Sequence, residues 1–207
     1  MSRYWYLASS LPGLLFGTSV PLSSQDFLGF CKRLMNPKDY LETEAVPRFL
    51  EGSNAAHGSG GTADTQLSLP CIRSAFLKSF LVWDRGFKNE LSRLRARSGG
   101  KNEEAYLREG GQADEAVKAA VACFGVDDPL KAEIGIEKER WSAVERLSAL
   151  SGFDLDFIVS YRIKLLINER LHGLAAEAGK DSYRRLYEEI FGTARREAAA
   201  DTPGERA

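Results

Sequence analysis

Two aspartates that stand two residues apart are the first candidates for chemistry in this sequence. Asp154 and Asp156 could act as paired carboxylates in general acid–base catalysis. They also stand at the start of a strongly apolar segment, where an aspartate can cap free N–H groups of a helix and favour the positive end of its dipole. This position favours capping over catalysis.

A glycine-rich stretch is the second candidate. Gly58–Thr62 has the composition of a phosphate-binding loop, but it lacks the Gly-Lys-Ser/Thr ending and follows no expected strand. His57 lies beside it, and no nucleophile motif surrounds any serine of the chain. We interpret the stretch as a loop and predict no catalytic residue and no cofactor.

Cysteine and histidine are scarce. Cys31, Cys71 and Cys123 are far apart, odd in number and free of any Cys-x-x-Cys spacing, which argues against a disulfide framework and a zinc ribbon. His57 and His172 are the only histidines, so a metal site would depend on carboxylates. We predict no metal site and a reducing, cytoplasmic environment.

Polar side chains interrupt the most apolar segment of the chain, near residues 155–170. A buried charge must be paired, so these side chains either face solvent or bind a partner. The opening segment adds aromatic residues of the types enriched at interface cores. The predicted partner interface comprises Tyr4, Trp5, Tyr6, Arg162, Lys164, Glu169 and Arg170.

Nearly every periodic segment that could position these residues repeats at 3.6 residues rather than 2. The longest stripe predicts a long helix with Trp83 buried, and consists of Ile72, Phe76, Phe80, Trp83, Phe87, Leu91 and Leu94. Helices are also expected after Ser23, over 39–50 with a break or kink at Pro47, over 116–124, after Asp128, over 154–167 and over 183–194.

Two of the shorter patterns predict specific buried faces. The first face comprises Phe27, Cys31, Leu34 and Met35. The second comprises Ala116, Val117, Ala120, Val121 and Phe124.

These patterns predict an all-α fold: a single compact multi-helix domain of about six or seven helices with an irregular or extended N-terminal segment. The only strand candidate is Arg3 to Ala8. The expected domain covers residues 1–197, with a flexible loop at 51–68 and a disordered tail at 198–207.

Composition agrees with an ordinary globular chain. The 207 residues are 43% hydrophobic, enough for a core that needs no disulfide or metal. Lys and Arg number 28 against 29 Asp and Glu, so the basic surplus typical of nucleic-acid binding is missing. No apolar run approaches the ~20 residues of a membrane span, and the interrupted N-terminal segment is expected to be retained rather than cleaved as a signal.

Two regions together resemble a known family. The first is RYWYLASSLPGL followed by PLSSQDFLGFC. The second is Asp128–Glu133, then Arg140-Trp141, then FDLDFIVSYRIKLLINERL from Phe153 to Leu171. They resemble an uncharacterised bacterial family encoded in V/A-type ATPase operons, and the second region is distantly similar to the C subunit of these ATPases, also called the d subunit.

The resemblance implies a role without chemistry. The C subunit is an all-helical funnel between the central shaft and the membrane rotor ring, so the chain is expected to be a non-catalytic coupling or adaptor subunit of the stalk. Its partners would be other subunits of the ATPase, and its place would be cytoplasmic and peripheral to the membrane. A transient helical adaptor or assembly factor for the same ATPase is the alternative, and an all-α enzyme is a third hypothesis.

Overall fold

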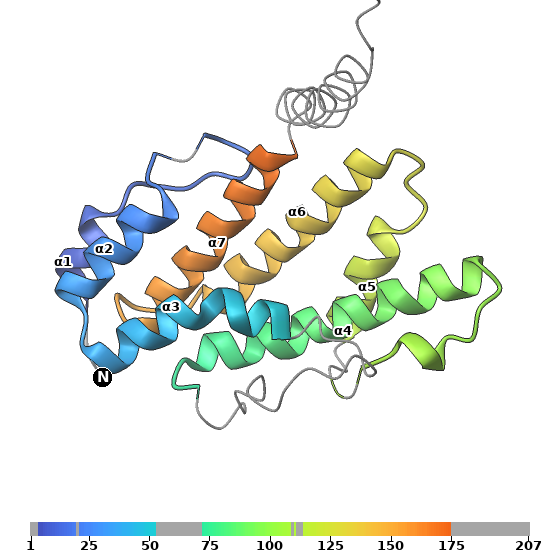
Figure 1. Cartoon of the computed structure of the whole chain (residues 1–207), viewed down its shortest axis with the longest axis horizontal. Coiled ribbons are helices and arrows are strands. Elements are labelled where there is room, and N and C mark those ends of the chain that lie inside the picture. The colour runs from blue at the N-terminus through green and yellow to red at the C-terminus, as the bar shows by residue number, and fades with distance from the viewer. Residues whose placement is uncertain (1–3, 20, 53–71, 109, 111–113, 175–207) are drawn as a thin grey trace, which may run out of the picture. The chain divides into compact units, whose positions relative to one another are not determined.

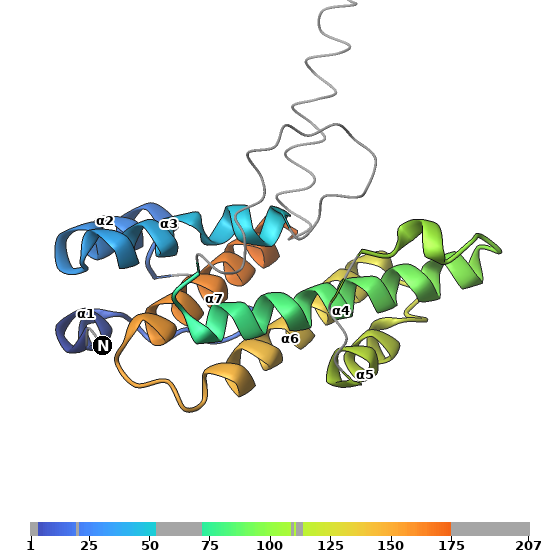
Figure 2. The same ribbon diagram turned by 90° about the horizontal axis from the view of Figure 1, so that it is seen from below.

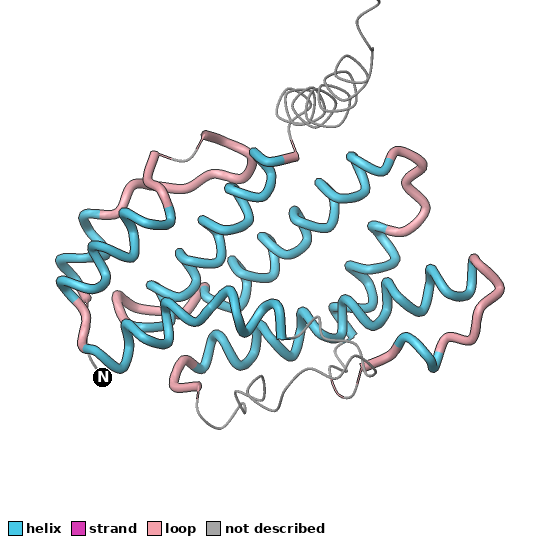
Figure 3. The backbone as a smooth tube through the Cα atoms, viewed as in Figure 1, coloured by secondary structure: helices cyan, strands magenta, loops and turns pink. Residues whose placement is uncertain are grey.

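The computed structural model describes residues 4–19, 21–52, 72–108, 110 and 114–174. The chain divides into two units, residues 1–169 and residues 170–207. All described helical residues up to Glu169 belong to the first unit. The described residues form helices and no strand (Figures 1 and 3). The helices are α1 (Trp5–Ser10), α2 (Ser24–Leu34), α3 (Pro37–Gly52), α4 (Ala75–Ser98), the 3₁₀ helix η3 (Glu104–Tyr106), α5 (Asp114–Cys123), α6 (Pro129–Ser148) and α7 (Leu155–Gly173). The prediction of an all-α fold is confirmed.

Short polar side chains begin these helices where the sequence predicts. Ser23 Oγ accepts a hydrogen bond from Asp26 N (3.1 Å) at the start of α2. Asp128 Oδ1 accepts one from Leu130 N (2.9 Å) at the start of α6. Asp154 Oδ1 accepts one from Phe157 N (3.2 Å), which confirms Asp154 as a helix cap.

The stripe on α4 forms a large part of the core. Trp83 is buried as predicted, and its ring stacks on Phe87 at 5.1 Å and on Phe80 at 6.0 Å between centroids. Leu91 is buried and Leu94 half-buried, so the helix leaves the core toward its C-terminal end. Gly99 caps that end, and Gly100 follows with a positive φ of 64°.

Helix α7 carries buried residues on every side, as the spread of its apolar residues over nearly every face predicts. Figure 1 shows it between α2 and α6. The ring of Tyr161 stacks on Phe27 of α2 at 5.4 Å, and Lys164 Nζ lies 5.0 Å from the ring of Trp141 on α6. Helix α7 thus joins the α2 side of the unit to the α6 side.

The structure corrects one prediction about the backbone and half of another, the break or kink expected at Pro47. The opening segment is not extended at Trp5–Ser10, because it forms the short helix α1, whose Leu7 and Ala8 are buried. Helix α3 does not break at Pro47. Val46 and Leu50 are buried on either side of Pro47, and this packing holds the helix continuous despite the missing N–H group.

One predicted face of α5 was half wrong. Val117, Val121 and Phe124 are exposed, whereas the buried face consists of Ala116, Ala119, Ala120 and Cys123. These small side chains let α5 pack closely against α4, and the larger side chains turn outward. Leu34 of α2 is likewise exposed, because it comes at the end of its helix.

Several predictions fall outside the described residues. Residues 51 and 52 of the expected loop belong to α3, and the rest of 51–68 lies outside. The expected helix over 183–194 and the tail at 198–207 also lie outside, so a single domain over 1–197 stays a prediction. In the part of the chain that is described, no helix is both long enough and apolar enough to cross a membrane.

Candidate partner-binding surface

Aromatic side chains from two distant parts of the chain meet at α1. The rings of Trp5 and Phe153 lie 4.6 Å apart, and Phe153 meets Phe157 edge-on at 5.7 Å. Trp5 is 54% exposed, Tyr6 75% and Phe153 39%. We call Trp5, Tyr6 and Phe153 the aromatic patch. The exposed rings of Trp5 and Phe153, packed on each other and next in sequence to exposed Tyr6, are suited to burial by a partner.

The backbone joins the two parts of this patch. Tyr4 N donates a hydrogen bond to Phe153 O at 2.5 Å, which ties the start of α1 to the loop between α6 and α7. Trp5 and Phe153 therefore keep their positions relative to one another without a partner.

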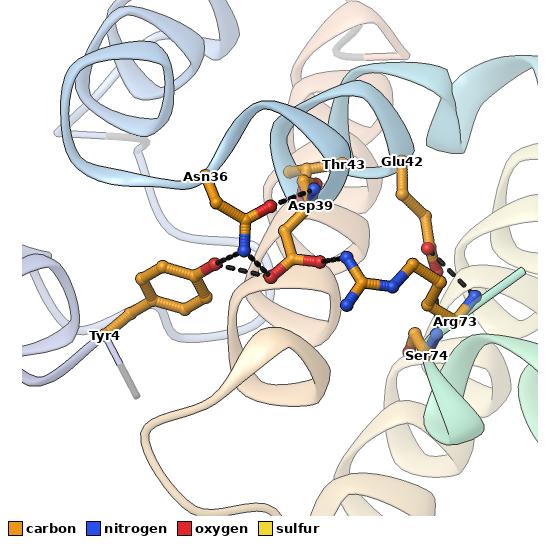
Figure 4. A network of polar contacts seen from close by, with 7 residues as sticks. All are labelled: Tyr4, Asn36, Asp39, Glu42, Thr43, Arg73 and Ser74. Atoms are coloured by element: carbon orange, nitrogen blue, oxygen red, sulfur yellow. Dashed lines mark hydrogen bonds and ion pairs between the residues drawn. The ribbon is translucent and has the colours of Figure 1, made fainter. Parts of the chain in front are cut away.

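Beneath α1, a polar network holds Tyr4 in place (Figure 4). Tyr4 Oη donates to Asp39 Oδ2 at 2.5 Å, and Asn36 Nδ2 donates to the same oxygen at 2.7 Å. Arg73 forms an ion pair with the other oxygen, Asp39 Oδ1. Asp39 is 2% exposed, and its buried charge is satisfied by three donors, of which the Arg73 side chain is half exposed.

The same network reaches the starts of α4 and α7. Glu42 accepts hydrogen bonds from Arg73 N (2.9 Å) and Ser74 N (2.8 Å) just before α4. Ser74 Oγ caps α4 by accepting from Leu77 N and donates to Asp156 Oδ1 at 2.6 Å. Asp156 thus binds the start of α4 as well as standing in the first turn of α7.

The hydrogen bonds of this network hold helices together. Each buried carboxylate accepts hydrogen bonds from two or more donors that belong to other parts of the fold. Elements α1, α3, α4 and α7 are therefore positioned together by charge-assisted bonds. Among the described residues, no three His, Cys, Asp or Glu side chains gather as ligands for a metal ion.

A second buried network joins α4 to α6. Asp84 is fully buried and pairs with Lys88 Nζ (2.5 Å) and Arg140 Nε (3.0 Å). Arg140 Nη1 also pairs with Glu137 Oε1 at 3.1 Å. Burial lowers the pKa of Lys88, against the opposing attraction of Asp84.

The predicted polar edge of α7 is only partly a free surface. Lys164 is half-buried, and its Nζ lies 3.2 Å from Glu145 Oε1 of α6. Glu169 accepts hydrogen bonds from Ser24 N (2.8 Å) and Ser24 Oγ, so it caps α2. Arg170 is exposed and is the first residue of the second unit.

Two predicted interface residues are buried, and their exposure was predicted wrongly. Tyr4 is 7% exposed because its hydroxyl binds Asp39 inside the fold. Arg162 is 4% exposed and lies beneath α2, with its guanidinium carbon 5.9 Å from the ring centroid of Phe27. Neither side chain can contact a partner at the existing surface.

An open cavity of about 310 Å³ lies between α4, α5 and α6. Trp83, Ala119 and Ala143 form part of its wall, and an ion pair between Glu115 and Arg146 joins α5 to α6 beside them. None of the predicted interface residues lines it.

Two residues of the site could not be predicted from the sequence. Phe153 completes the aromatic patch, and Asp39 holds Tyr4 from 35 residues away. A phenylalanine after Gly152 and an aspartate near a helix start are ordinary in sequence, and only the tertiary contacts give them these roles. Comparison of the chain with protein-family models, with curated proteins and with solved structures finds no match.

Proposed function

We propose that this protein is a non-catalytic subunit of a V/A-type rotary ATPase, acting as a coupling or adaptor subunit of the central stalk. Its partners would be the central shaft and the membrane rotor ring. The resemblance of RYWYLASSLPGL and of Phe153–Leu171 to the family encoded in V/A-type ATPase operons supports the assignment. The two resembling regions also supply Trp5 and Phe153, whose rings meet in the aromatic patch.

The observation that carries the proposal is the aromatic patch itself. Trp5 and Tyr6 are more than half exposed, although they belong to residue types that contribute strongly to binding when covered. The network beneath α1 binds Tyr4 at the start of this helix, and the Trp5 ring packs on Phe153, so the Trp5 ring is positioned before any partner arrives, which reduces the entropy lost on binding.

A subunit that transmits rotation must also resist deformation. The buried pairs of Asp84 with Lys88 and Arg140 tie α4 to α6, and the network around Asp39 ties α1, α3, α4 and α7. Such bonds would let a load applied at the aromatic patch pass to the helices behind it.

Purification of the native ATPase followed by mass spectrometry tests the proposal. The protein should be present in fixed stoichiometry with the catalytic and stalk subunits. Its absence from the purified complex, with no association of the folded protein with either sector at micromolar concentration, would contradict the stable-subunit assignment. Association only with incompletely assembled complexes would favour a transient assembly factor instead.

Single substitutions locate the surface. Trp5→Ala and Tyr6→Ala should each weaken association by about 1–4 kcal/mol while the midpoint of thermal unfolding stays nearly unchanged. Tyr106→Ala is the matched control, because Tyr106 is an exposed aromatic residue on another element, η3. Equal losses for all three variants would show that the aromatic patch is not the contact surface.

A further inference from the structure

The buried charges of the described residues are five carboxylates and one cation, Arg162. Each carboxylate has a partner within the fold. Asp39 binds Tyr4, Asn36 and Arg73, and Glu42 binds two backbone amides. The remaining pairs are Asp84 with Lys88 and Arg140, Glu90 with Arg93, and Glu137 with Arg140.

Arg162 departs from this rule. Its Nε and Nη1 are buried and make no hydrogen bond to any described residue. Its surroundings in α2 are the ring of Phe27 and the fully buried Cys31, which offer no anionic oxygen at neutral pH. Two buried N–H donors of a charged side chain are costly without an acceptor, and packed apolar side chains of similar volume often cost less.

The carboxylate that acts electrostatically on Arg162 is already engaged. Glu169 follows Arg162 by two helical turns on α7, and it holds Ser24 N and Ser24 Oγ at the start of α2. Release of Glu169 from Ser24 would remove a cap from α2. Arg162 therefore lies beneath α2 without a bonded carboxylate, because Glu169 binds Ser24 instead.

We infer that Arg162 is the anchor of an anion-binding site, and that its ligand is a carboxylate side chain of the partner protein, admitted beneath α2 on association. A guanidinium donates charge-assisted hydrogen bonds to carboxylate oxygens, and Nε and Nη1 of Arg162 are buried donors without an acceptor in the described part of the fold. The identity of the partner rests on the proposed function, whereas the anion site itself can be tested on the isolated protein.

The first experiment compares Arg162 with Arg140, an arginine whose side chain is 11% exposed and paired with two carboxylates. Arg162→Met should raise the midpoint of thermal unfolding of the isolated protein, because it removes an unpaired charge and keeps an apolar chain beneath α2. Arg140→Met, the matched control, should lower the midpoint, because it leaves Asp84 and Glu137 without this partner. A loss at Arg162→Met as large as that at Arg140→Met would overturn the inference.

The second experiment uses small anions as probes. At equal ionic strength, sodium acetate should raise the unfolding midpoint of the wild-type protein more than sodium chloride, and this excess should vanish in Arg162→Met and in Arg162→Gln. An equal response of wild type and both variants would overturn the site. An excess seen with inorganic phosphate but not with acetate would overturn carboxylate as its ligand.

The third experiment measures association with the ATPase. Arg162→Met should weaken it by about 30-fold or more, as expected when one member of a buried charge pair is removed. Unchanged affinity in a stabilised Arg162→Met variant would overturn the partner carboxylate. If the wild-type protein does not bind the ATPase at all, the proposed function fails, and the acetate comparison still decides whether the anion site exists.

Discussion

At the scale of single residues, Trp83 shows how an apolar stripe becomes a core. Its ring stacks between Phe80 and Phe87 and is 4% exposed, but its Nε1 is buried and makes no hydrogen bond to the described part of the chain. The residue therefore stabilises the fold through its area and shape rather than through its polar atom.

Two substitutions at Trp83 separate these contributions. Trp83→Ala should lower the free energy of unfolding by roughly 3–5 kcal/mol, the usual cost of truncating a core aromatic residue. Trp83→Phe should cost clearly less, because it keeps an aromatic ring in the stack and removes an N–H group that contributes little. Urea denaturation measures both, and a change below ~1 kcal/mol for Trp83→Ala would contradict the assigned core position.

The buried hydroxyl of Tyr4 donates a hydrogen bond to Asp39 and accepts one from Asn36 Nδ2 at 3.0 Å. Tyr4→Phe removes a donor to Asp39 and should lower the free energy of unfolding by about 1–3 kcal/mol, since the carboxylate stays buried. Tyr40→Phe is the control, because its hydroxyl binds Glu44 in an exposed pair, and its effect should stay within about 0.5 kcal/mol. Equal effects in chemical denaturation would argue against the network of Figure 4.

At the scale of elements, capping side chains decide where helices begin. Asp128 receives hydrogen bonds from Leu130 N and Lys131 N, whereas the exposed Asp127 stands one residue before this cap position. Asp128→Ala should lower the free energy of unfolding by about 1 kcal/mol, and Asp127→Ala should have little effect. The midpoint of urea unfolding distinguishes the two variants. A larger loss of stability in Asp127→Ala than in Asp128→Ala would contradict Asp128 as the residue that caps α6.

The buried face of a helix can differ from the face that its sequence pattern predicts, as α5 shows. The row of Val117, Val121 and Phe124 carries the larger apolar side chains, yet the buried face of α5 consists of alanines and Cys123. Close approach of two helices favours small side chains, and this preference outweighs the burial of two valines and a phenylalanine here. Figure 2 shows α5 lying against α4 from a second direction.

At the scale of the whole molecule, two buried protonated groups couple stability to alkaline pH. Burial raises the pKa of the Cys31 thiol from 9.0 to about 12, although Arg162 acts in the opposite direction. Burial also raises the pKa of Tyr161 from 10.0 to about 12. Between the unfolded and folded pKa values, unfolding releases a proton from each group, so a higher pH favours the unfolded state.

We therefore expect the free energy of unfolding to fall between about pH 9 and pH 12. Cys31→Ala should reduce this slope, because it removes one of the two groups, and should leave the slope below about pH 9 unchanged. Tyr6→Phe is the control, because Tyr6 is 75% exposed. Urea midpoints measured across this range check the prediction, and an unchanged slope in Cys31→Ala would refute it.

The sequence by itself determined the elements and much of the core. Periodicity located the longer helices α2 to α7 but not the short helix α1, and capping residues such as Asp128 and Asp154 marked helix starts. These signals are local, because a helix needs only near neighbours to satisfy its backbone and to align one apolar face. Burial of Trp83 followed from the same local pattern.

Only the tertiary structure decided which polar residues are surface and which are scaffold. Tyr4 and Trp5 are adjacent aromatic residues, yet one is buried on Asp39 and the other is exposed beside Phe153. Arg162 and Arg170 are both arginines of α7, yet one lies beneath α2 and the other is exposed. These differences depend on partners distant in sequence, and pairing between distant residues is set by packing of the whole unit rather than by any local pattern.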